Sequence, residues 1–451
     1  MGERLTKSRP SSLTRWVPAF VWLECYEPTC LQADVVAGLT AAAVVVPQAM
    51  AYGAIAGLPL VVGLYTALVP LVVYAVMGTS RPLSVTTTST IALLTAGALH
   101  QVVPGANDEK LIVAAGVLAC LVGAVLIAAS ALRLGIVASF ISEPVLTGFK
   151  AGVGLVIVVD QIPKLLGVHF PKGHFFHNLI SIVDHLPQAS MPTMVLAAAM
   201  LALQLGLQNF LPRVPASLVT VVTGITASGL VGLSGLGIEL VGEVKGGLPS
   251  FALPGLSLLE TLWPPAVGIA LMSFVETIAA GQAFRNVDEP RPEPNRELLA
   301  IGLTNLIGGL FQNMPSGGGT SQTAVNRRAG AHTQVAGLVT AGIVLAVLFF
   351  LAPLVHLMPQ ATLATVVVIP CAGMIKLPEF RAILRTRVME FSWAVASCWS
   401  RAPRHLAGHP CGRPALAASF DLSWKSSSSF RSGAKTRDRC LPSPLRGTSG
   451  G

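Results

Sequence analysis

Two polar segments, rich in glycine and hydroxyl-bearing residues, interrupt a chain that is apolar over most of its length. The first runs from Gly78 to Leu94 as GTSRPLSVTTTSTIALL, and the second from Asn313 to Gly330 as NMPSGGGTSQTAVNRRAG. Each contains a proline that disrupts a helix, Pro82 or Pro315. A helix that begins after such a break offers free backbone N–H groups and a positive dipole end, which together bind anions. The two segments therefore predict facing half-helices that hold an anion at mid-depth in a membrane.

Other polar residues lie inside apolar segments. Glu276 is the charged residue of PAVGIALMSFVETIAAGQAF, and a carboxylate inside a membrane is costly enough to be a functional candidate. In VVVPQAMAYGAIAGLP, Pro47 kinks a helix, and Gln48 and Tyr52 lie four residues apart on one face. Two alternatives stay open: Glu276 can be a structural strut bonded to hydroxyls, and the glycine- and hydroxyl-rich segments can serve close helix packing.

The composition is that of a membrane protein. The 451 residues are 52% hydrophobic and 11% charged, with a mean hydropathy of +0.67, whereas soluble domains carry about 25% charged residues. The net charge of +9 is no nucleic-acid signal, because the stretch from residue 401 onward has nine basic and two acidic residues. That stretch accounts for +7 of the total, so the rest of the chain is nearly neutral. The membrane domain therefore lacks the basic surface that nucleic-acid binding requires, and no nucleic-acid partner is predicted.

Apolar runs long enough to cross a bilayer, or to stop midway in it, recur along the chain. They are predicted at 34–57, 59–78, 84–99, 111–131, 136–159, 191–211, 215–236, 259–283, 297–312, 320–328, 334–357 and 361–377. Most basic residues between these runs lie in alternate loops, which all face the same side of the membrane as the basic N-terminus. Because cytoplasmic loops are enriched in Lys and Arg, this pattern predicts a cytoplasmic N-terminus. The sequence thus predicts an all-α, multi-pass protein of the plasma or inner membrane.

The chain divides into three parts by composition. Residues 1–33 form a basic N-terminal segment, and 34–398 form the membrane domain of about twelve spans. Residues 399–451 are rich in Ser, Arg and Pro, which is typical of a disordered tail or of a reading frame that has shifted.

Six ordered motifs resemble the SulP (sulfate permease) family of anion transporters from about Asp34 to Cys398. They are PQAMAYGAIAGLP, GLYTALVPLVVYAVMGTSRPLSV, EPVLTGFKAGVGLVI, ALMSFVETIAAGQAF, NRELLAIGLTNLIGGLFQNMP and SQTAVNRRAGAHTQVAGLVTA. The resemblance implies two inverted repeats of seven spans, with a core domain that slides against a gate domain, and usually a cytosolic STAS domain. Family members carry sulfate, bicarbonate, chloride or dicarboxylates, by cation symport or by exchange.

The resemblance also implies a set of site residues. The substrate pocket of the family maps to one group from each of three spans: Gln48 and Tyr52 in the first, Val85, Thr86 and Thr87 at the third, and Gly319, Thr320, Ser321 and Gln322 at the tenth. Glu276 stands at the position of the acidic residue of the eighth span that is implicated in ion coupling.

Two departures from the family pattern matter. Many members have an arginine after the tenth-span serine, where this chain has Gln322, and a missing fixed cation favours coupling to H⁺ or Na⁺ beside Glu276. The last two spans and the STAS domain are not recognised, so the second repeat is expected to be incomplete and the chain poorly stable, or even a non-functional truncated product.

We therefore expect secondary active transport of a small anion, with sulfate as the leading candidate and bicarbonate or a dicarboxylate as alternatives. A nucleobase–cation symporter of the same architecture is the second hypothesis. No catalytic constellation, metal site or cofactor is predicted, so an enzyme is not expected. The family resemblance makes a homodimer a further expectation.

Overall fold

The protein is described here from a computed structural model. It describes Ala19, Tyr26, Glu289 and residues 28–103, 107–136, 143–170, 175–211, 214–241, 247–253, 258–285, 292–351 and 355–373. The predicted tail, 399–451, lies outside these residues.

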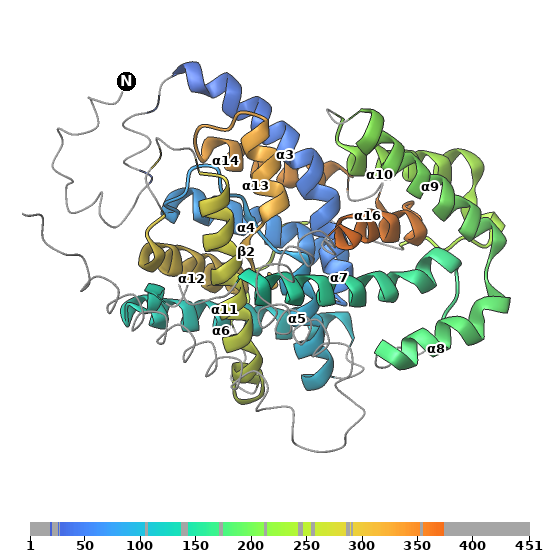
Figure 1. The fold of residues 1–451 in the computed structure, drawn as a ribbon, viewed down its shortest axis with the longest axis horizontal. Helices are drawn as coiled ribbons and strands as arrows, with labels where there is room; N and C mark the ends of the chain where they lie inside the picture. The colour runs from blue at the N-terminus through green and yellow to red at the C-terminus, as the bar shows by residue number, and fades with distance from the viewer. Residues whose placement is uncertain are drawn as a thin grey trace, which may run out of the picture.

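The described chain is almost entirely helical, and each predicted span contains a helix (Figure 1). The first half holds α3 (Pro28–Ile55), α4 (Leu60–Met77), α5 (Ser89–Val102), α6 (Asp108–Ala131), α7 (Glu143–Leu166), α8 (Phe175–His185), α9 (Met191–Phe210) and α10 (Ala216–Val231). The second half holds α11 (Leu259–Ala283), α12 (Pro294–Leu310), α13 (Thr320–Arg328), α14 (Val335–Ala346) and α16 (Gln360–Ala372). Two strands, β1 (Val85–Thr86) and β2 (Gly317–Gly318), lie in the two polar interruptions.

Within the described part of the chain, five helices are long and apolar enough to cross a membrane: Cys30–Ile55, Leu60–Met77, Asp108–Ala131, Met191–Phe210 and Leu259–Ala283. Three shorter apolar stretches accompany them at Ala216–Val231, Val335–Phe350 and Gln360–Ala372. Prolines and glycines set several helix ends. Pro59 and Pro359 precede α4 and α16, and Gly232 ends α10 in a left-handed conformation that favours glycine.

The helices form two packed groups. One contains α3 to α6 and α11 to α14, and the other contains α7, α9, α10 and α16 (Figure 1). Contacts between the groups are made by α3 with α10 and α16, and by α5 with α7. This division confirms the expected core and gate domains, and the two groups are called by those names below.

The core group has the internal symmetry of an inverted repeat. If α3, α4, α5 and α6 are exchanged for α11, α12, α13 and α14, most packing pairs are preserved, the exception being that α5 packs more extensively on α6 than α13 does on α14. Thus α4 packs on α14 as α12 packs on α6, and α3 packs on α13 as α11 packs on α5. The strands β1 and β2 pair with each other at the centre of this exchange.

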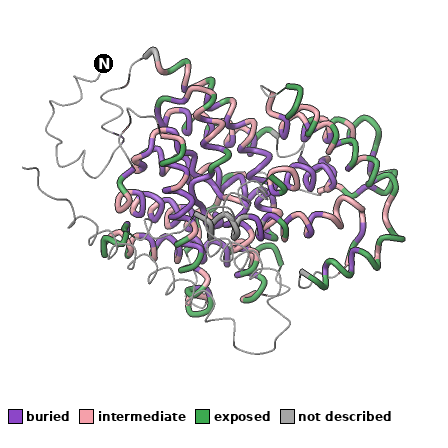
Figure 2. The backbone as a smooth tube through the Cα atoms, viewed as in Figure 1, coloured by how far each residue is buried: buried purple, intermediate pink, exposed green. Residues whose placement is uncertain are grey.

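Buried residues concentrate in the core group, whereas α8, α9 and the outer turns of α10 expose many side chains (Figure 2). Close helix approach in the core depends on glycines. A Cβ on Gly63 of α4 would lie 1.9 Å from the Ala49 carbonyl oxygen on α3, and one on Gly309 of α12 would lie 2.6 Å from the Gly116 carbonyl oxygen on α6. Only glycine fits at these crossings.

The fold differs from the sequence expectation after the fifth span. The stretch between the predicted spans 136–159 and 191–211 was expected to be a loop, but it contains the helix α8. Its eleven residues are too few to cross a bilayer, which is why a search for long apolar runs misses it.

Candidate functional site

The two polar interruptions meet in space. Their strands pair antiparallel, with Val85 opposite Gly318 and Thr86 opposite Gly317. The backbone N–H of Gly319 extends the pairing by donating to the carbonyl of Ser84 at 3.0 Å. The pairing therefore brings the start of α5 next to the start of α13, as the paired breaks predicted.

The glycines of the second interruption serve packing as well as ligand access. A Cβ on Gly317 would lie 2.8 Å from Cδ1 of Ile91, and one on Gly318 would lie 2.8 Å from Cα of Thr277. Gly317 is thus pressed between α5 and α11, and Gly318 between α11 and Leu83. The Gly318 N–H also donates to the Thr277 hydroxyl at 2.8 Å.

The two half-helices begin differently. Thr88 caps α5 with its hydroxyl, which accepts from the backbone N–H of Ile91 at 3.3 Å. Gly319 precedes α13 and provides no side-chain cap, so the N–H groups of the first turn have no partner within the helix. Thr320 and Ser321 in that turn are exposed. The uncapped, accessible N-terminus of α13 is suited to an anionic ligand.

A chain of polar side chains connects the half-helices to α3. The Thr86 hydroxyl donates to Oε1 of Gln322 at 2.5 Å, and Nε2 of Gln322 donates to Oε1 of Gln48 at 3.4 Å. Tyr52 lies one turn beyond Gln48 on α3, and all four residues are buried. The structure thus brings together residues from the first, third and tenth predicted spans.

Glu276 joins this cluster through the cap of α5. Its Oε2 accepts a hydrogen bond from the Thr88 hydroxyl at 2.7 Å, and its side chain is buried in α11. A carboxylate in this position places negative charge at the start of a half-helix, where the dipole is positive.

Two nearby hydroxyls have no hydrogen-bond partner among the described residues. They belong to Thr87 and Thr90, both fully buried at the start of α5. A buried hydroxyl without a partner is costly, so such groups commonly bind a ligand or an ordered water. They point to ligand chemistry beside Glu276 and the Thr86–Gln322–Gln48 chain.

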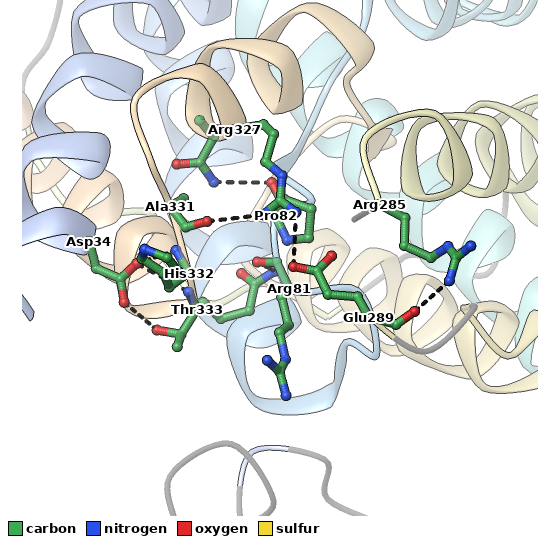
Figure 3. A network of polar contacts seen from close by, with 11 residues as sticks. Asp34, Arg81, Pro82, Arg285, Glu289, Arg327, Ala331, His332 and Thr333 are labelled. Carbon is green, nitrogen blue, oxygen red and sulfur yellow. Dashed lines mark hydrogen bonds and ion pairs between the residues drawn. The ribbon is translucent and has the colours of Figure 1, made fainter. Parts of the chain in front are cut away.

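Side chains of the second half hold the backbone of the first interruption. Nδ2 of Asn326 donates to the Pro82 carbonyl at 3.0 Å (Figure 3). Nε2 of Gln334 lies within 3.1 Å of three carbonyl oxygens, those of Ser80, Arg81 and Leu83. Four consecutive carbonyls before β1 are therefore bound from α13 and the turn that follows it.

Ionic contacts extend this framework (Figure 3). Arg327 pairs with Glu289 at 3.0 Å, which ties α13 to the chain between α11 and α12. Asp34 on α3 accepts from the backbone N–H groups of His332 and Thr333 and from the Thr333 hydroxyl. These contacts fix the C-terminal end of the second interruption.

A further buried carboxylate, besides Glu276 and Asp34, was missed by sequence reasoning. Glu297 at the start of α12 accepts hydrogen bonds from the Tyr74 hydroxyl at 2.9 Å and from the Thr79 backbone N–H at 3.1 Å. In the sequence, Glu297 is an acidic residue at the start of a predicted span. In that position it looks like an ordinary charged residue at the membrane–water interface. Asn326 and Gln334 were missed because their partners are backbone carbonyls far away in the sequence.

The fold and the facing half-helices define an inverted-repeat membrane carrier. Residues 31–397 match the sulfate permease family, and the chain belongs to that family. A probable sulfate transporter of Mycobacterium tuberculosis is 35% identical over 384 residues, which cover 85% of this chain and 68% of that protein.

Two solved structures share the fold. A structure of SLC26A9 matches with a TM-score of 0.82 and 23% identity, covering 86% of this chain and 65% of that one. The transmembrane domain of the cyanobacterial bicarbonate transporter BicA matches with a TM-score of 0.76 and 23% identity, covering 84% and 96%. The expected seven-plus-seven fold is thereby confirmed.

Proposed function

We propose that this chain carries a small anion across the membrane by secondary active transport, with sulfate as the leading candidate. The observation that carries the proposal is the β1–β2 pairing, which sets the N-termini of α5 and α13 side by side. Relatives named as sulfate transporters support sulfate, and BicA, named as a bicarbonate transporter, keeps bicarbonate as the alternative.

The proposed anion lies between the two half-helices. The free N–H groups of Thr320, Ser321 and Gln322 donate to its oxygens, and the amide of Gln48 and the hydroxyl of Thr87 add neutral donors. Tyr52 lines the same site from α3. Neutral donors and backbone dipoles suit a sulfate oxygen as well as a bicarbonate oxygen, so the size of the site selects between them.

We propose that Glu276 couples transport to a cation. An anion beside this carboxylate is repelled unless a proton or a metal cation neutralises one of the charges. Gln322 gives no compensating charge where many family members have arginine, so H⁺ or Na⁺ supplies it. The hydrogen bond from Thr88 holds the carboxylate at the start of α5, which supports this role for Glu276.

The experiment is uptake by the purified full chain in proteoliposomes. Labelled sulfate is supplied with a proton gradient, a sodium gradient, both or neither, and unlabelled bicarbonate or a dicarboxylate competes. We expect saturable sulfate uptake that one gradient drives and that Glu276→Gln uncouples from it. Uptake indifferent to both gradients, or coupling that survives in Glu276→Gln, contradicts the coupling proposal. Absence of sulfate uptake, together with uptake of labelled bicarbonate by the same vesicles, reassigns the substrate.

We also propose an orientation with the N-terminus in the cytoplasm of a plasma or inner membrane. Loop charges support it, because Arg81, Arg133 and Arg328 fall on one predicted side while Asp108 and Glu239 fall on the other. The test is a reporter enzyme that is active only outside the cytoplasm, fused to the N-terminus. The reporter should be inactive, and an active reporter would contradict this orientation.

A further inference from the structure

The short helix α8 has three distinct faces. Side chains three, four or seven residues apart share a face of a helix, so Leu179, Ile180 and Val183 form one stripe. Asn178 and Ile182 lie on a second face, and His177 and Asp184, seven residues apart, lie on a third.

The second face packs against the protein and is partly polar. Asn178 is 6% exposed and Ser181 is 8% exposed. Nδ2 of Asn178 donates to Oδ1 of Asp160 on α7 at 3.2 Å, which holds α8 against that helix. The polar amide therefore faces inward, where a water-soluble helix would put its apolar residues.

The apolar stripe faces outward. Ile180 is 61% exposed and Val183 is 65% exposed, and Leu179 beside them is exposed as well. Along the chain, the exposed apolar residues continue through Leu186 to Met191 and Val195 at the start of α9, a helix long and apolar enough to cross a membrane. A surface continuous with a spanning helix shares the surroundings of that helix.

The third face limits the depth of α8. His177 and Asp184 are both exposed and border the apolar stripe. A carboxylate deep in the hydrocarbon is strongly unfavourable, so this edge requires water or lipid headgroups. The eleven residues of α8 extend only roughly 16 Å, about half the thickness of the hydrocarbon core.

We infer that α8 lies in the plane of the membrane, at the boundary between headgroups and acyl chains. The stripe of Leu179, Ile180 and Val183 contacts the acyl chains, the edge with His177 and Asp184 contacts headgroups and water, and the Asn178 face contacts α7. The partner of this surface is the lipid bilayer. The inside-out amphipathic pattern disfavours water, and the continuity with α9 favours lipid over a second copy of the chain.

The test measures the depth of α8 in the full chain. A fluorescent amino acid replaces Val183 by stop-codon suppression, and a second sample carries it in place of His177. Both are reconstituted in vesicles of phosphatidylcholine and phosphatidylglycerol. Quenchers are lipids with a nitroxide near the headgroup, lipids with a nitroxide at the chain end, and aqueous iodide.

We expect the probe at position 183 to be quenched about twofold more by the shallow nitroxide than by the deep one, and only weakly by iodide. At position 177, iodide should quench about twofold more strongly than at position 183. The same fluorescent amino acid in place of Leu179, on the same stripe, should give the result expected for position 183. It replaces the sample labelled at 183 if that sample does not fold.

Three results would overturn the inference. Equal iodide quenching at 183 and 177 makes α8 a solvent-exposed helix. Stronger quenching by the deep nitroxide at 183 places it across the hydrocarbon core. Absence of lipid quenching together with energy transfer between differently labelled copies makes the stripe an interface between two chains.

Discussion

Gln322 concentrates the chemistry of the site in one side chain. It accepts from Thr86, donates to Gln48 and stands in the first turn of α13. Many members of the family have an arginine there, which adds a fixed positive charge near the eighth-span carboxylate. In the proposed mechanism, the neutral amide leaves the charge of Glu276 to be balanced by the coupling cation.

Gln322→Arg should therefore make uptake less dependent on the cation gradient. The guanidinium supplies the positive charge beside Glu276, and the apparent anion affinity without a gradient should rise about tenfold. Uptake in proteoliposomes with and without the gradient measures this. Gln322→Met is the control: it removes the hydrogen bonds without adding charge, so it should weaken uptake but keep the gradient dependence.

Thr87 and Thr86 are neighbours with different expected roles. The Thr87 hydroxyl has no partner among the described residues, whereas the Thr86 hydroxyl bonds to Gln322. Thr87→Val should leave the melting temperature unchanged and weaken anion binding by about 1 kcal/mol. Thr86→Val should lower the melting temperature. Equal effects of the two variants on both measurements would contradict the assignment.

At the level of single residues, the sequence revealed those side chains that are polar in apolar surroundings. Gln48, Glu276 and Gln322 are such residues, and the structure brings them to one place. It could not reveal Gln334 or Asn326, because a donor to a distant backbone carbonyl leaves no local pattern.

Among the elements, the first interruption has little regular structure of its own and is held by its neighbours. Gln334 bonds to three of its carbonyls and Asn326 to a fourth. The start of α5 is therefore positioned from the second half of the chain. The prolines and glycines predicted the positions at which the helices break. They did not predict that the two breaks pair as strands, or in which register.

Gln334→Leu should displace the first interruption. Three carbonyls lose their donor, so the N-terminus of α5 moves relative to α13, and we expect the KM for the anion to rise by about tenfold or more. Initial rates of uptake against anion concentration measure this change. Gln208→Leu, on the exposed end of α9, is the matched control and should behave as the wild type.

Gly63→Ala should separate α3 from α4. The added Cβ would overlap the Ala49 carbonyl, so the helices must move apart at a cost of about 1 to 3 kcal/mol. A thermal melt in detergent should show a clear decrease. Gly97→Ala is the control, because a Cβ at Gly97 has open space around it. An unchanged melt for Gly63→Ala would show that the crossing tolerates a methyl group.

In the whole molecule, the proposed binding site belongs to the core group, and the gate group packs beside it. Cys371 on α16 and Tyr52 on α3 share one buried apolar cluster, which lies between the groups. The spacing of the two breaks predicted the repeats, and the family resemblance implied this division into core and gate. It did not predict α8, whose exposed apolar stripe is too short to be recognised as a span.

Relative movement of the groups should change the reactivity of Cys371. This thiol is buried here, and sliding of the gate against the core exposes the surface between them. Alkylation by a membrane-permeant maleimide should be several-fold faster during anion transport than without anion, and should stop uptake. Cys120, buried between α6 and α12, should remain unmodified, and Cys371→Ser should make uptake resistant. A rate independent of the anion would contradict this movement.

The exchange of packing pairs between the two halves has an energetic consequence. Each half can adopt the conformation of the other while equivalent helix contacts are kept. The state open to one side of the membrane then becomes the state open to the other side. The free-energy difference between these states then arises only where the halves differ in sequence. Thr88, which caps α5, and Gly319, which leaves α13 uncapped, are such a pair. The side on which the empty carrier rests is therefore determined by the positions at which the two halves differ, of which these two helix caps are one pair.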